Sequence, residues 1–174
     1  MEPLFSHRPD SAVPDAAPGP PPSRVYRLAV PAPRDVVFSA FVGDLHLWWP
    51  ANYTGFGAGT YAYVDEGIIG EESEAGESQV WGAVAEEAPG EFIQFAWTLA
   101  WRSEVPTRVR VDFADAESSD ALPDGGTVMT FTHDGWAAGA EGRAQYEKYS
   151  EWPIILGRFA AYFGVPEDSV EPLA

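Results

Sequence analysis

The chain is poor in cysteine, in basic residues and in long hydrophobic runs, and each shortage excludes a class of protein. It has no cysteine, which excludes disulfides, thiolate metal sites and a cysteine nucleophile and fits a reducing compartment. Ten Lys and Arg residues stand against 27 Asp and Glu residues, so the formal net charge is −17. A surface this negative repels phosphate backbones and anionic head groups, so we expect no nucleic-acid partner and no membrane partner. The same charge would suit a basic partner protein.

Two further absences concern targeting. No stretch approaches the roughly 20 apolar residues that a membrane-spanning helix needs. The N-terminus lacks the basic start and apolar run of a signal peptide. We therefore expect a cytoplasmic protein.

Material for a hydrophobic core is plentiful. Hydrophobic residues make up 45% of the 174 residues and aromatic residues 14%, with seven tryptophans. A chain of this length and composition suits one domain with a real core and is not typical of a disordered protein.

The two ends of the chain differ in composition from the middle. Residues 1–22 contain seven prolines and few apolar groups, which predicts a disordered, Pro-rich tail. The hydrophobic pattern runs from residue 23 to residue 166, which we assign to the domain. Residues 167–174 are expected to form a flexible C-terminal tail.

The hydrophobic patterns predict an α+β fold. Residues 24–30 alternate as a first strand, and residues 33–35 open a short helix that a second helical turn at 45–48 follows. The middle of the chain then reads as short strands joined by turns, which indicates an antiparallel sheet of about six to seven strands. Their expected ranges are 60–64, 68 onward, 78–86, 91–99, 107–113 and 127–133.

A helix is expected to close the chain. Tyr149, Trp152, Leu156, Phe159 and Phe163 recur at spacings of three and four and form one apolar stripe. Proline inside a helix removes a backbone donor and crowds the preceding turn, so Pro153 predicts a kink or a restart near residues 150–153.

One face of the predicted sheet is apolar and needs a cover. Alternation places large apolar groups and His133 on that side of three strands, and the C-terminal helix is the long amphipathic element able to cover it. The nine positions are Ile93, Phe95, Trp97, Val109, Val111, Phe113, Met129, Phe131 and His133. Sequence leaves open whether the space between sheet and helix is filled or empty.

Five motifs, in order along residues 23–164, resemble one known superfamily. They are Val30–Phe41, Leu47–Pro50, the hairpin from Trp81 to Trp97, Gly125–Trp136, and Trp152–Phe163. The chain thereby resembles the START-like (SRPBCC) superfamily, and within it the branch related to the heat-shock chaperone ATPase activator (AHSA1-like). The resemblance implies a helix-grip fold, in which a curved antiparallel sheet wraps a long C-terminal helix after two short helices. The chain departs from the closing motif at Glu151, where the branch has Gly, and at Pro153.

The tryptophans and the apolar sheet face are the candidate ligand-binding residues, because ligand pockets are lined by apolar and aromatic groups with a few polar ones. The predicted set is Trp48, Trp49, Phe95, Trp97, Val109, Val111, Phe131, His133, Trp136, Trp152, Leu156 and Phe159. Core packing alone is the alternative role for each of them.

Catalytic and metal chemistry find little support in the sequence. The histidines and carboxylates lack the clustered spacing of a zinc site, so we expect no metal and no cofactor. Asp134 and Glu151 are expected to flank the cavity mouth, either as an acid–base pair or as solvated surface residues. No serine has a neighbouring His–acid arrangement.

Three functions remain in order of preference. The first is a non-catalytic protein that binds a small hydrophobic or aromatic molecule between the sheet and the C-terminal helix. The second, implied by the resemblance, is a protein-interaction module that binds a partner such as a chaperone. The third is a polyketide cyclase-like enzyme. Either a monomer or a homodimer is compatible with the sequence.

Overall fold

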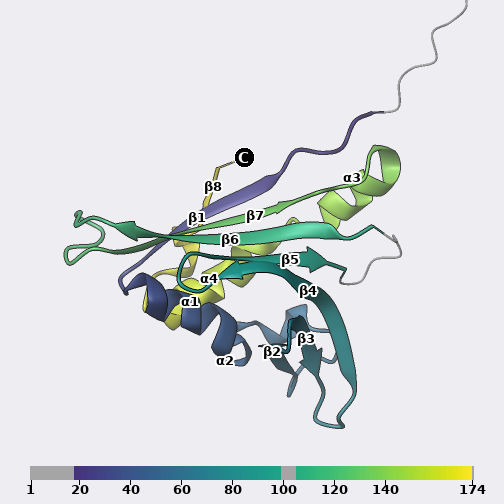
Figure 1. Cartoon of the computed structure of the whole chain (residues 1–174), viewed down its shortest axis with the longest axis horizontal. Coiled ribbons are helices and arrows are strands. Elements are labelled where there is room, and N and C mark those ends of the chain that lie inside the picture. The colour runs from purple at the N-terminus through teal and green to yellow at the C-terminus, as the bar shows by residue number, and fades with distance from the viewer. Residues whose placement is uncertain (1–17, 99–104, 174) are drawn as a thin grey trace, which may run out of the picture.

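A curved antiparallel sheet and a C-terminal helical segment dominate the fold in the computed structural model, which describes residues 18–98 and 105–173 (Figure 1). The eight strands lie in the order β2-β3-β4-β5-β6-β7-β1-β8. Strands β2 to β7 are therefore sequential neighbours, and β1 joins them beside β7. Their bounds are β1 (Arg24–Val30), β2 (Tyr61–Asp65), β3 (Ile68–Glu72), β4 (Ser78–Ala88), β5 (Phe92–Trp97), β6 (Thr107–Ala116), β7 (Gly126–Asp134) and β8 (Glu171–Pro172).

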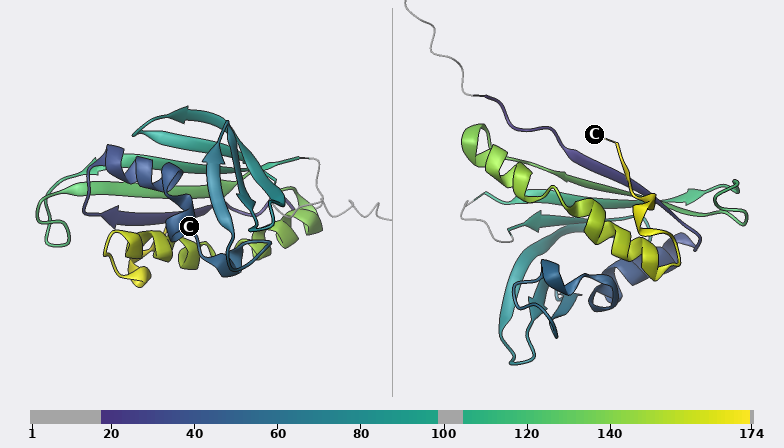
Figure 2. Two further views of the ribbon diagram at one scale, coloured as in Figure 1. Left: turned by 90° about the horizontal axis from the view of Figure 1, so that it is seen from below. Right: turned by 180° about the vertical axis from the view of Figure 1, so that it is seen from behind.

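The helices lie on one side of this sheet. Helices α1 (Arg34–Gly43) and α2 (Leu45–Trp48) follow β1, and α3 (Gly139–Lys148) and α4 (Trp152–Tyr162) follow β7. Figure 2 shows α4 crossing the concave face, with α1 and α2 beside it. Two short 3-10 helices, η1 (Ala51–Tyr53) and η2 (Glu167–Ser169), complete the fold. No helix in the described ranges is both long and apolar enough to cross a membrane.

The sheet curves because its register is interrupted twice. The pairing of β3 with β4 shifts between Ile69 and Gly70, and that of β4 with β5 shifts between Val84 and Glu86. Such bulges bend a strand and increase its twist. The curvature carries β4 and the β2–β3 hairpin around the helices, as Figure 1 shows.

The predicted inner face is confirmed. All nine inward positions of β5, β6 and β7 are at most 3% exposed, and the eight apolar ones belong to a single core with residues of α1 and α4. The α+β class, the first strand, the two short helices and the helical C-terminal segment also agree with the sequence-based prediction.

The C-terminal helical segment restarts where Pro153 predicts it. Helix α3 ends at Lys148, and α4 begins at Trp152, which leaves Pro153 in the first turn of α4. Proline fits there because the first backbone N–H groups of a helix have no intrahelical acceptor. Glu151 is the residue that precedes this restart.

Three features differ from the prediction. The sheet has eight strands, not six or seven, because β8 pairs with Tyr26 and Arg27 of β1. Residues 167–172 therefore form a helical turn and an edge strand in place of the expected flexible tail.

At the other end of the chain, Pro18–Pro22 contact the domain. The Trp136 Nε1 donates a hydrogen bond to the Pro22 carbonyl, and the Gly139 N–H donates one to the Pro18 carbonyl, both over 3.0 Å. The backbone carbonyls of this segment thus hold it against the domain, and amino-acid composition does not indicate such bonds. The rest of the expected tail, residues 1–17, lies outside the described residues.

Candidate functional site

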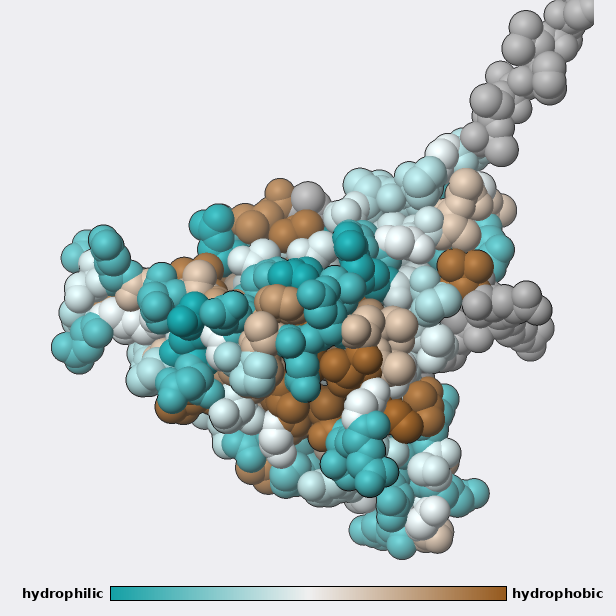
Figure 3. All heavy atoms as spheres, in the orientation of Figure 1, coloured by the Kyte–Doolittle hydropathy of each residue, from teal (hydrophilic) through white to brown (hydrophobic). Residues whose placement is uncertain are grey.

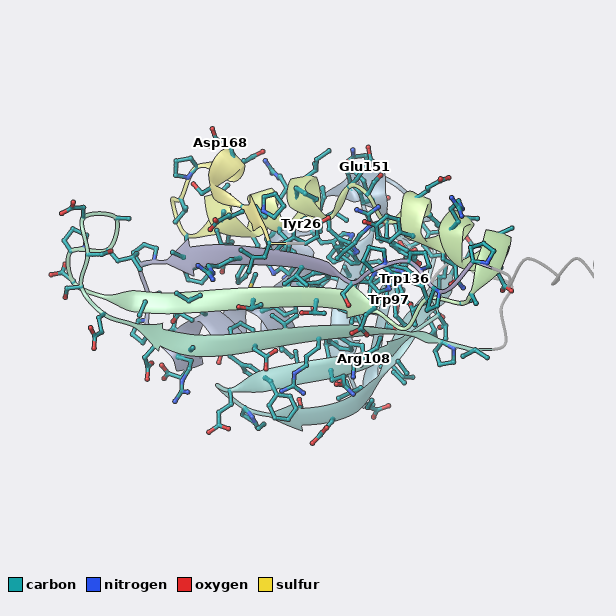
Figure 4. All side chains as sticks on the ribbon, turned by 90° about the horizontal axis from the view of Figure 1, so that it is seen from above. Tyr26, Trp97, Arg108, Trp136, Glu151 and Asp168 are labelled. Carbon is teal, nitrogen blue, oxygen red and sulfur yellow. The ribbon has the colours of Figure 1, made fainter. Side chains whose placement is uncertain are left out.

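The end of the sheet nearest the α3–α4 junction carries a dense aromatic cluster. His133 lies 4.2 Å from the Trp136 ring and 4.6 Å from the Tyr149 ring, centroid to centroid. Trp97 and Trp152 are 5.6 Å apart in an edge-to-face arrangement. Figure 4 shows Trp97 and Trp136 near this end of the sheet, with Glu151 on the helical side. Edge-to-face and offset contacts of this kind stabilise aromatic groups beyond the area that they bury.

A directed chain of hydrogen bonds runs through His133. An indole N–H can only donate, so the Trp152 Nε1 donates to His133 Nδ1 over 3.0 Å. The neutral ring therefore carries its proton on Nε2, which lies 2.7 Å from Thr107 Oγ1. Thr107 Oγ1 in turn donates to the Trp97 carbonyl over 3.3 Å.

These contacts remove His133 as a proton acceptor. Burial, with a smaller contribution from the positive charge of Arg24, lowers the pKa of His133 to about 3. The imidazole is neutral at physiological pH, and both of its nitrogens are engaged in hydrogen bonds. The ring thus holds the Trp152 indole and the Thr107 hydroxyl, and its one nitrogen lone pair, on Nδ1, is already used by Trp152.

Most of the predicted ligand-binding residues are packed against one another. Trp97 and Trp152, which the sequence suggests as opposing walls, touch each other directly. Phe131 lies 4.5 Å from Trp152, and Phe159 lies 4.8 Å from Trp48. The predicted residues that are buried in this way and do not line the pocket described next are Trp48, Phe95, Val109, Val111, Phe131, His133, Trp136, Leu156 and Phe159.

A small pocket of about 150 Å³ opens beside this cluster, where α3 ends and α4 begins. Its walls come from the segment after α2, from η1, from the end of β5 and from both C-terminal helices. The lining residues are Trp49, Tyr53, Trp97, Lys148, Tyr149, Glu151, Trp152 and Ile155. A dry cavity of about 150 Å³ is large enough to hold a benzene ring.

Hydrogen bonds fix the aromatic walls of the pocket. The Trp97 Nε1 donates to the Tyr149 hydroxyl over 3.0 Å, and the Trp49 Nε1 donates to the Tyr53 carbonyl over 3.1 Å. Burial raises the pKa of Tyr149 to about 12, which the Trp97 donor partly offsets. Tyr149 is therefore a neutral phenol throughout the physiological range, and the pocket walls are preorganised.

Polar groups lie at the rim. Desolvation raises the pKa of Tyr53, and the charge of Glu151 and a hydrogen bond to its carboxylate add to the effect. Partial burial lowers the pKa of Lys148. A phenol, a carboxylate and an amine thus surround an otherwise apolar pocket, the usual composition of a small-molecule site.

Sequence reasoning found part of this pocket. It named Trp49, Trp97 and Trp152, and it placed Glu151 at the cavity mouth. It missed Tyr53, which lies in the Gly-rich stretch that follows the two short helices, and Lys148 and Ile155; it placed Tyr149 on the apolar stripe of the closing helix without assigning it to the site. Ile155 lies three residues after Trp152 on α4, so helical spacing counted from the restart at residue 152 was the signal that could have found it.

Other candidate groups have structural partners or lie elsewhere. Asp134 does not line the pocket, and both of its carboxylate oxygens accept hydrogen bonds from Arg108. In the part of the chain that the structure describes, no three His, Asp or Glu side chains gather as metal ligands do. Trp101, Arg102 and Ser103 fall in the segment outside the described residues.

Comparisons with known proteins identify the fold. No family model matches the chain, and no curated protein matches it. Among solved structures, CalC from Micromonospora echinospora, described as a self-sacrificing resistance protein, has a TM-score of 0.60 and 21% identity over 82% of this chain and 94% of its own. Txn09, described as an anthrahydroquino-gamma-pyrone synthase complexed with SUM, has a TM-score of 0.51 and 22% identity over 83% and 98%. A Chromobacterium violaceum protein has a TM-score of 0.52 and 19% identity over 82% and 98%. At this level of identity the similarity extends to the architecture, and the chain has the helix-grip fold.

Proposed function

We propose that the chain is a START-like, non-catalytic binding protein that holds one flat aromatic ring of a small hydrophobic molecule in the pocket at the α3–α4 junction. The observation that supports this proposal is the pocket itself. It has a volume of about 150 Å³, and its walls include three indoles and two phenols. Aromatic walls favour an aromatic guest through stacked and edge-to-face contacts.

The polar residues at the rim of the pocket would orient the proposed ligand. Only one ring fits the pocket, so the remainder of a larger molecule would extend past Tyr53, Lys148 and Glu151 toward solvent. The Tyr53 hydroxyl already donates to Glu151, so Lys148 is the donor that can reach the ligand, and the Glu151 carboxylate keeps lone pairs that can accept. The proposed ligand is therefore an aromatic molecule with hydroxyl or carbonyl substituents. The solved structure of Txn09, described as complexed with SUM, supports the view that a protein of this fold can hold a bound molecule.

A titration with 2-naphthol tests the proposal. Binding should be saturable and should quench tryptophan fluorescence, because Trp49, Trp97 and Trp152 line the pocket. Ile155→Phe should fill the pocket and weaken binding by about tenfold, the equivalent of about 1.4 kcal/mol. Ile154→Phe is the matched control, since the adjacent Ile154 is 49% exposed and does not line the pocket.

Two outcomes would contradict the proposal. One is the absence of saturable quenching in the parent protein. The other is an equal effect of Ile155→Phe and Ile154→Phe on affinity. If no ligand binds, the protein-interaction function becomes the preferred one.

A polyketide cyclase-like activity is the second candidate, favoured by the similarity to the synthase Txn09. Proton transfer in this pocket would have to use the rim groups, because His133 is neutral and fully hydrogen-bonded. Glu151→Gln would then abolish turnover of a bound polyketide-like substrate while leaving its affinity within about twofold. Binding without turnover in the parent protein would exclude this second function.

A further inference from the structure

A second hollow lies on the β2–β3 hairpin and shares no residue with the aromatic pocket. It has a volume of about 530 Å³, within the usual range of small-molecule sites. Its walls include two tyrosines, an isoleucine and three carboxylates: Tyr61, Tyr63, Asp65, Glu66, Ile68 and Glu72. We call this hollow the hairpin groove.

Strand alternation gathers these side chains on one face. Tyr61, Tyr63 and Asp65 alternate along β2 and pair with Glu72, Gly70 and Ile68 of β3. The intervening Ala62 and Ile69 point to the other face, where each is 2% exposed. The turn residues Glu66 and Gly67 both have positive φ, 47° and 77°, which is the geometry of a tight hairpin turn.

The aromatic rings form a row beside the carboxylates. Tyr61 and Tyr63 are stacked at 6.5 Å with 21° between their planes, and His46 of α2 lies 4.5 Å from Tyr61. Gly70 has no side chain beneath Tyr63, and a Cβ built there would lie 3.3 Å from the Tyr63 hydroxyl. The row of tyrosine rings is open to solvent, because Tyr61 is 51% exposed.

Among residues 18–98 and 105–173, the carboxylates of the groove have no ion-pair partner. The four ion pairs of the described residues involve Asp112, Asp115, Asp134 and Glu167, none of which lies in the groove. Neither lysine nor arginine occurs among the described residues that line it. Asp65, Glu66 and Glu72 therefore create an uncompensated negative potential next to the electron-rich faces of the tyrosines.

From this arrangement we infer that the hairpin groove binds a small organic cation, such as an amine or a guanidinium compound. A cation over a tyrosine face is attracted by the ring quadrupole, and carboxylates beside the ring strengthen the attraction. The net charge of −17 would raise the local concentration of such a ligand. The groove is thus a site for cations, separate from the apolar pocket.

Calorimetric titration of the full chain with spermidine tests the inference at about 0.1 M salt, where charges more than about 10 Å apart are largely screened. Asp65→Asn/Glu72→Gln should weaken binding by about tenfold, because both removed charges line the groove. Asp120→Asn/Asp124→Asn is the matched control: it removes two exposed carboxylates from the β6–β7 loop, alters the net charge equally and should change affinity by less than about twofold.

A second variant separates the tyrosines from the charge. Tyr61→Leu/Tyr63→Leu keeps apolar bulk but removes the π faces, and it should weaken binding by about fivefold at unchanged net charge. Melting curves show whether each variant is folded. The inference is overturned if spermidine does not bind the parent protein, if the groove and loop variants weaken binding equally, or if the folded leucine variant binds as the parent does. Because the two sites share no lining residue, 2-naphthol binding should be unchanged in these variants, so the two proposals can fail independently.

Discussion

His133 is the residue on which the aromatic cluster depends. It accepts a hydrogen bond from Trp152 and donates one to Thr107, and it contacts Trp136 and Tyr149 through its ring. Because both nitrogens are engaged in the neutral form, protonation would break the Trp152 bond and leave a buried positive charge near Arg24. The residue thus links the geometry of the pocket walls to pH.

The first prediction concerns the pH dependence of stability. The pKa of His133 is about 3 in the folded protein and about 6.5 in the unfolded chain, so the unfolded state binds the proton first as pH falls. The free energy of unfolding should drop as pH falls from about 6.5 toward about 3, by about 1 kcal/mol between about pH 7 and about pH 5.5. Urea unfolding at these two pH values measures the change. His133→Gln should reduce this difference, and an unchanged difference in this variant would contradict the assignment.

The second prediction concerns the packing between sheet and helix. Val111 is fully buried and pairs with Ile93 and Phe131 on the neighbouring strands. If the interior is filled, Val111→Phe should lower the free energy of unfolding by about 1–3 kcal/mol through overpacking. The control is Val80→Phe, at a strand position that is 52% exposed, which should be close to neutral. A neutral Val111→Phe variant would mean that the interior holds an empty cavity.

At the scale of elements, α3 contacts the N-terminal segment at residues 18–24, which is distant in sequence. Of its ten residues only Gly142 and Gln145 are buried. Arg24 donates two hydrogen bonds to the Tyr146 carbonyl and lies 3.7 Å above the Tyr146 ring. The Pro18 carbonyl accepts from Gly139 at the N-terminus of the helix. Since Lys148 and Tyr149 line the pocket, the segment at residues 18–24 helps to position one of its walls.

Truncation tests this role of the N-terminal segment. Deletion of residues 1–22 removes the acceptors of Gly139 and Trp136, two hydrogen bonds that should be worth about 1 kcal/mol each. The Tm should therefore fall by roughly 4 to 8 °C. Deletion of residues 1–17 keeps both acceptors and should lower the Tm by less than about 2 °C. Equal Tm values for the two truncations would show that residues 18–22 contribute nothing.

The elements that the sequence predicts well are those in which apolar residues recur with a regular period. The inner faces of β5, β6 and β7 alternate regularly, and α4 has its apolar stripe, so both were predictable. β8 is two residues long and includes Pro172, and α3 has a polar composition, so neither carries a periodic signal. For the site, sequence indicates which side chains face inward. It does not indicate that Trp97 and Trp152 touch, because that depends on side-chain volume and on the position of the α3–α4 junction.

At the scale of the whole molecule, two hollows of different chemistry lie in separate places on one fold. The pocket at the α3–α4 junction is apolar and aromatic, and the hairpin groove is aromatic and acidic. The face shown in Figure 3 is largely hydrophilic, with hydrophobic residues gathered in smaller patches. Arg108 lies on the face of the sheet away from the helices (Figure 4), and it forms an ion pair with Asp134. The large excess of acidic groups keeps the molecule negative, and among the described residues that line the apolar pocket Glu151 is the one carboxylate.

The central claim is that an aromatic guest binds at the α3–α4 junction and not elsewhere. The indole N–H signals in a nitrogen-15 NMR spectrum test it directly, because the described tryptophans have distinct partners. On titration with 2-naphthol, the indole signals of Trp49, Trp97 and Trp152 should shift together and saturate, since all three line the pocket. Those of Trp48 and Trp136, which donate to the Ala40 and Pro22 carbonyls, should stay nearly unchanged. Shifts confined to Trp48 and Trp136, or no saturable shift at any of the five, would contradict the account.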